Sequence, residues 1–126
     1  MLRHLETSAV VAFTDELHHS LPAILTALDA AERNRADVHA AHEAYRLIHA
    51  LKGAASMVGL AALGFLLNLA EEQLEGPVSG AALLSDEVIE ALRASVPKFA
   101  TYMDEAIAGR PVAPVAIELA ETLRGG

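Results

Sequence analysis

A histidine, a lysine and a glycine lie close together in the otherwise largely apolar stretch IHALKGAASMVG, residues 48–59. An imidazole is a good nucleophile near neutral pH when one ring nitrogen is unprotonated. In a helix, Lys52 would lie about 4.5 Å along the axis from His49, where its positive charge would suit an incoming phosphoryl group. Gly53 would remove bulk beside the same histidine. A glycine inside a helix costs about 1 kcal/mol relative to alanine, so we infer that another molecule approaches closely there.

The helix predicted over about residues 37–58 has two different faces. At 100° per residue, one broad face is apolar and consists of Ala44, Leu47, Ile48, Leu51, Ala54, Ala55 and Val58. The residues within about 60° of His49 form the opposite face, and they are His42, Tyr45, Arg46, Lys52, Gly53 and Ser56. His49 is therefore expected at the centre of a polar face and not in the core.

A second helix is predicted over about residues 61–75, after a chain reversal at Gly59. Asn68 and Glu71 lie nearly as far after Gly59 as His49 lies before it, so both can come alongside the histidine. A Glu71 carboxylate there would accept a hydrogen bond from Nδ1–H, fix the tautomer and leave Nε2 free to attack. The acidic positions of this helix, Glu71, Glu72 and Glu75, are otherwise expected to form a mostly solvated face.

The elements that carry these residues are all expected to be helices. Alanine and leucine dominate the apolar content, which favours helices over strands. The helical spacing of apolar residues, interrupted by glycine and proline, predicts helices over about residues 8–31, 37–58, 61–75, 85–108 and 114–124. Pro22 is expected to kink its helix or restart it, and Pro97 is expected to bend its helix. Residues 76–84 are expected to be a loop. Short connections between long helices predict an antiparallel four-helix bundle, residues 1–110, with a short fifth helix and tail, residues 111–126, in the same domain or leading into a linker.

Composition excludes several classes of function. The net charge of −8 argues against nucleic acid as a partner, because phosphate binding needs clustered lysine and arginine. The chain has no cysteine, which excludes disulfides and thiol chemistry and is compatible with a reducing cytoplasm. Polar residues and glycines interrupt the longest apolar stretch, residues 54–70, so we expect a buried hairpin there and no membrane span. His42 and His49 would lie about 10 Å apart, too far for one metal ion.

The sequence His49-Ala-Leu-Lys52-Gly53, with Gly59, Leu63 and Glu71 after it, resembles the histidine-containing phosphotransfer (HPt) domain family. The likeness is greatest to the N-terminal HPt domains of chemotaxis-type histidine kinases. It implies a four-helix bundle in which His49 is phosphorylated, Lys52 supports the phosphoryl group and Glu71 hydrogen-bonds the histidine.

The resemblance also implies a docking surface beside His49, where Gly53 leaves room for the partner and Ser56, Tyr45 and Asn68 lie nearby. Core packing is an equally good explanation for Tyr45. The chemotaxis-type pattern often has a second histidine where this chain has Asn68, and asparagine can form hydrogen bonds but cannot titrate.

The implied partners are a histidine kinase catalytic domain and a response-regulator receiver domain, which would bind the Mg-ATP and Mg²⁺. The domain itself would bind no cofactor or metal and have no autonomous catalysis; as an isolated domain it would be monomeric and cytoplasmic, and it could be a module of a larger kinase. Three alternatives stay open: an HPt-like scaffold that binds a partner without transfer, a merely solvated histidine beside a surface lysine paired with glutamate, and a histidine-based metal or hydrolytic site.

Overall fold

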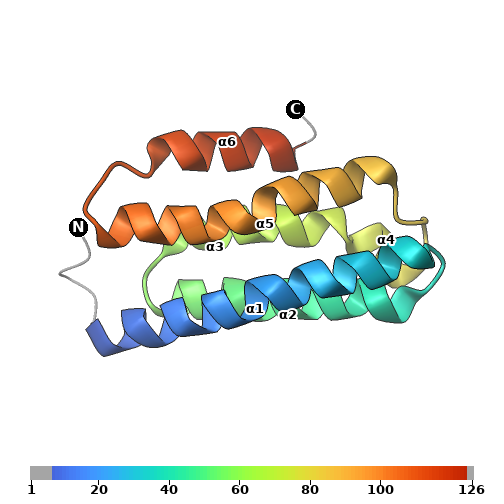
Figure 1. Ribbon diagram of the computed structural model, residues 1–126, viewed down its shortest axis with the longest axis horizontal. Helices are drawn as coiled ribbons and strands as arrows, with labels where there is room; N and C mark the ends of the chain where they lie inside the picture. Colours follow the sequence, from blue (N-terminus) through green and yellow to red (C-terminus); the bar gives the residue numbers. More distant parts are fainter. Residues whose placement is uncertain (1–6, 125–126) are drawn as a thin grey trace.

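The computed structural model describes residues 7–124, and every regular element in that range is a helix. The helices are α1 (Thr7–Arg33), α2 (Val38–Met57), α3 (Ala61–Gln73), α4 (Glu75–Ser79), α5 (Asp86–Ile107) and α6 (Ala113–Leu123) (Figure 1). The predicted all-α class is therefore confirmed. No helix within residues 7–124 is both long enough and apolar enough to cross a membrane.

The four long helices α1, α2, α3 and α5 pack around one apolar core, with α6 placed against α5 and α3 on the side away from α1 and α2 (Figure 1). The amphipathic pattern of each helix explains this arrangement, because each buries its apolar stripe against the others. The largest fully buried side chains come from the four long helices and the turn after α3, and they are Leu17, Ile24, Leu28, Ile48, Leu51, Leu63, Leu67, Leu74, Ile89, Leu92, Phe99 and Met103. Val115, Leu119 and Leu123 of α6 join the same core.

The reversal between α2 and α3 sets the register of the candidate site. Val58 is the C-cap of α2, and Gly59 follows with φ 84°, a left-handed conformation that glycine adopts without strain. The N–H of Leu60 donates to the carbonyl of Ala55 at 2.9 Å, and the N–H of Gly59 donates to that of Ser56 at 3.2 Å. These two hydrogen bonds form a Schellman motif, which ends α2 and turns the chain back into α3. The reversal expected at Gly59 is confirmed.

Side chains cap the starts of α2 and α5. The carboxylate of Asp37 accepts a hydrogen bond from the N–H of His39 at 2.9 Å, and the hydroxyl of Ser85 accepts one from the N–H of Val88 at 3.2 Å. Each bond satisfies a backbone donor that has no partner inside the helix. Both helices therefore begin within one residue of the predicted position.

Two expectations about helix breakers need correction. α1 runs unbroken through Pro22, so the helix does not restart there. Residues 76–84 are not all loop: α3 ends at Gln73, and the short helix α4 follows at once. Pro77 is tolerated because it lies in the first turn of α4, where its missing N–H would have had no helical partner.

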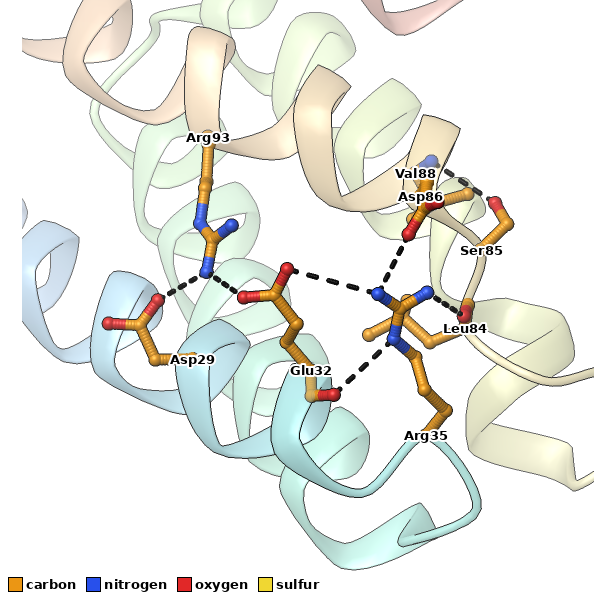
Figure 2. Close-up of polar contacts among 8 residues, drawn as sticks. All are labelled: Asp29, Glu32, Arg35, Leu84, Ser85, Asp86, Val88 and Arg93. Carbon is orange, nitrogen blue, oxygen red and sulfur yellow. Dashed lines mark hydrogen bonds and ion pairs between the residues drawn. The ribbon is translucent and has the colours of Figure 1, made fainter.

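Two arginines tie α1 and the loop after it to α5 at one end of the bundle (Figure 2). Arg93 of α5 donates to Asp29 at 2.5 Å and to Glu32 at 2.6 Å, both on α1. Arg35, in the loop after α1, donates to Asp86 at the start of α5 at 2.7 Å. These contacts are partly exposed to water, so we assign them a role in orienting the helices and not a large share of stability.

Candidate functional site

His49 lies on the outer side of α2 with one edge of its ring turned toward α3. Its Nδ1 is 2.7 Å from Oε1 of Glu71, and its side chain is 60% exposed, against 6% for Glu71. An ionised carboxylate can only accept hydrogen bonds, so Nδ1 carries the hydrogen in this pair. In a neutral ring the lone pair is then on Nε2. The predicted contact between His49 and Glu71 is confirmed.

Glu71 is almost completely buried, and two donors hold its carboxylate. Oε1 faces His49, while Oε2 accepts a hydrogen bond from the ammonium of Lys52 at 2.9 Å. Burial raises the pKa of this carboxyl, but the hydrogen bonds from Lys52 and His49 outweigh that effect and bring the pKa below its ordinary value. Glu71 is therefore ionised at neutral pH. The expectation of a solvated face is wrong for Glu71, because the α2–α3 register places it against α2.

Lys52 is directed toward α3 by two acceptors. Besides Glu71, its ammonium donates to Oδ1 of Asn68 at 3.3 Å, and the amide nitrogen of Asn68 donates to Glu72 at 3.2 Å. Lys52 does pair with a glutamate of the neighbouring helix, and this is the same glutamate that holds His49. The result is a chain of polar contacts in which one buried negative charge lies between a lysine and the histidine.

The other residues assigned to the site lie around this chain of contacts. Tyr45 is half-buried and packs against the core, while its ring lies beside that of His49. Gly53 is exposed, and a Cβ built there would meet no atom within 4 Å. Ser56 is exposed at the contact between α2 and α3.

Close packing between α2 and α3 depends on Gly64 of α3, which was not predicted to belong to the site. A Cβ on Gly64 would lie 3.1 Å from the hydroxyl oxygen of Ser56 and 3.8 Å from the backbone oxygen of Lys52. Gly64 therefore lets the two helices approach closely beside the site. Its position four and seven residues before Asn68 and Glu71, on one helix face, was the signal available in the sequence.

The lowered pKa of Glu71 predicts a pH-dependent contribution to stability. Because the pKa is lower in the folded than in the unfolded chain, ionised Glu71 stabilises the fold above about pH 4.3, and this contribution disappears as the pH falls through the lowered pKa. The free energy of unfolding, measured in urea from pH 7 to pH 3, should therefore fall more steeply for the wild type than for Glu71→Gln.

Other carboxylates also lose ion pairs in acid, including Glu32 and Glu43, whose pKa values are lowered chiefly by hydrogen bonds from Arg93 and Arg46. Only the difference between wild type and Glu71→Gln reports on the site. Parallel curves for the two proteins would contradict the assignment of a stabilising, ionised Glu71.

The comparisons with known proteins agree with this fold. A family model described as "Hpt domain" matches residues 8–109, most of the chain, and the protein therefore belongs to the Hpt domain family. HPt domains in general are phosphocarrier modules that interact with histidine kinases and response regulators. A search of curated proteins finds no match.

One solved structure that this chain resembles is titled "Solution Structure of Histidine Phosphotransfer Domain of CheA". The two sequences are 20% identical, and the match covers 93% of this chain and 92% of the other, with a TM-score of 0.72. This likeness is one of fold. The structural match covers nearly the whole chain, whereas the match to the family model ends at residue 109.

Proposed function

We propose that this domain takes up a phosphoryl group on Nε2 of His49 from a histidine kinase catalytic domain or a receiver aspartate and passes it to a receiver aspartate. The observation that carries the proposal is the pair formed by an exposed imidazole and a buried, ionised glutamate on its Nδ1. This pairing leaves Nε2 as the free nitrogen, open to solvent and to a partner protein. Since the phosphoryl group would originate from ATP, we also propose that the domain works in the cytoplasm.

Phosphoryl transfer requires mainly that the domain position the nucleophile and stabilise the charges of the transition state. As Nε2 attacks phosphorus, the imidazole gains positive charge, and the carboxylate of Glu71 opposes that charge across a 2.7 Å contact. We assign the ammonium of Lys52 to the oxygens of the phosphoryl group, which it would reach by exchanging its contact with Asn68. We expect the domain to bind no cofactor, because its partners would supply Mg-ATP and Mg²⁺.

The test of this function is to identify the phosphorylated atom. The wild-type domain would be incubated with ATP and candidate kinases, or with phosphorylated receiver domains, and examined by ³¹P NMR and by mass spectrometry of its peptides. We expect an acid-labile, base-stable phosphoryl group on Nε2 of His49. A partner that binds tightly without ever labelling the protein would instead support a helical interaction scaffold.

Gly53 should distinguish docking from folding. Because a Cβ there meets open space, Gly53→Ala should raise the free energy of unfolding by about 0.5–1 kcal/mol through helix propensity alone. The larger Gly53→Leu should fold equally well but weaken receiver binding by about tenfold or more, because its side chain would stand between the two proteins. Urea denaturation and titration calorimetry with the receiver measure the two effects.

Gly64→Ala is the matched control for these substitutions. It gives the same gain in helix propensity, but its Cβ would press on Ser56, so its net effect on stability should be smaller than that of Gly53→Ala. If Gly53→Leu binds the receiver as tightly as the wild type, the assignment of Gly53 to the docking surface is wrong.

A further inference from the structure

Three rings lie in a row along α2, in addition to the hydrogen bond between His49 and Glu71. The ring of Tyr45 is nearly parallel to that of His49, with centroids 6.0 Å apart and planes at 10°. Toward the start of α2, the ring of His42 lies 6.2 Å from that of Tyr45 at 20°. Tyr45 also packs against the core, so the fold fixes its ring, whereas the side chain of His49 is largely exposed.

The hydrogen bond and the ring contact restrict different motions of His49. The side-chain torsion χ2 of histidine has two broad minima related by a ring flip. A flip would turn a ring carbon toward Glu71, so the hydrogen bond to Glu71 selects one of the two orientations. Tyr45, lying parallel beside the imidazole, opposes rotation of the ring plane itself. Since the lone pair of Nε2 lies in that plane, the two contacts together fix the direction of attack.

We propose that Tyr45 is a positioning residue for phosphoryl transfer at His49, a role that rests on the proposed function. In that step the Nε2 lone pair forms the new N–P bond while the bond from phosphorus to the donor atom breaks, and the electron pair of the broken bond leaves on the donor atom. The donor atom is an oxygen of the receiver carboxylate or of ADP, and it is the nitrogen of ammonia when the donor is phosphoramidate. No proton is transferred, since Nδ1–H stays between His49 and Glu71, and the ring becomes cationic. The aromatic ring of Tyr45 favours that developing charge as well as holding the plane.

The experiment uses phosphoramidate, a small phosphoryl donor that needs no docking, and compares it with a phosphorylated receiver domain. Tyr45→Leu keeps the apolar packing of the site but removes the ring, and we expect it to lower the rate of phosphorylation of His49 by about three- to tenfold with either donor. Tyr45→Phe keeps the ring and should restore the rate to within about twofold. His42→Leu, which leaves the Tyr45–His49 contact intact, is the matched control and should react like the wild type.

Two kinetic outcomes would overturn the proposal. A loss in Tyr45→Leu with the receiver but not with phosphoramidate would show that Tyr45 acts only in docking. An equal loss in Tyr45→Phe would assign the effect to the hydroxyl group and not to the ring. Thermal unfolding of each variant, followed by circular dichroism, verifies that the rates compare folded proteins.

A second measurement needs no phosphoryl donor, and it separates this proposal from the proposed function. Long-range ¹H–¹⁵N spectra of the unphosphorylated protein report the tautomer and order of the His49 ring. We expect one well-defined Nδ1–H form in the wild type and in Tyr45→Phe, and a broadened or mixed signal in Tyr45→Leu. If no donor labels the wild type, the proposed function fails. The effect of Tyr45 on the His49 ring is decided separately, because an unchanged His49 signal in Tyr45→Leu would overturn it.

Discussion

Replacing His49 with glutamine is expected to abolish acid-labile phosphorylation completely while leaving the helical fold intact. Glutamine has no nucleophilic ring nitrogen, so no N–P bond can form. The imidazole is largely exposed and lies outside the apolar core, so its loss removes little packing. Incorporation of radiolabelled phosphate from a competent donor measures the first effect, and circular dichroism measures the second.

His42→Gln is the matched control, because His42 is an exposed histidine on the same helix, two turns before His49. We expect it to be labelled like the wild type. Retention of label in His49→Gln would show that another group accepts the phosphoryl group, and the proposed function of His49 would then be wrong. Loss of label in both variants would show that the assay reports on the surface of α2 and not on one nucleophile.

Glu71→Gln is expected to slow phosphoryl transfer by about 10- to 100-fold without abolishing it, by analogy with the range seen when a metal-bound histidine loses its outer hydrogen-bond partner. A neutral amide has no charge to oppose the positive charge that develops on the imidazole. It can also turn its NH₂ group toward Nδ1, which would favour the tautomer with hydrogen on Nε2. Single-turnover kinetics with a phosphorylated receiver measure the rate.

Glu72→Gln is the control for this substitution, since Glu72 is the adjacent carboxylate, exposed to solvent and in contact with Asn68 and not with His49. It removes the same charge from the same helix, and the transfer rate should stay close to that of the wild type. If both variants slow equally, net charge and not the His49 contact controls the rate. The transfer rate of Lys52→Ala should lie between those of Glu71→Gln and Glu72→Gln, because this substitution leaves the contact between His49 and Glu71 in place.

Local signals in the sequence were enough to predict the helices and the outer position of His49. The two faces of α2 follow from the helical period, and its ends follow from Asp37 and Gly59, each acting within a few residues. The pairing of His49 with Glu71 was predictable for the same reason, because a tight reversal at Gly59 fixes which residues of adjacent helices lie level. The helical spacing of apolar residues also predicted α6, but it did not predict that α6 packs against α3 and α5.

Other features depended on how the helices rotate and meet, and only the tertiary structure decided them. Glu71 and Glu72 are adjacent glutamates in the same helix, yet only Glu71 is buried, because it faces α2. Burial raises the pKa of this carboxyl, and the hydrogen bonds from Lys52 and His49, which also depend on the packing of α2 against α3, keep it ionised. The arginine contacts that join α1 and the loop after it to α5 connect residues more than 50 positions apart in the chain. No local pattern specifies such contacts, because they arise only when packing of the apolar core brings distant segments together.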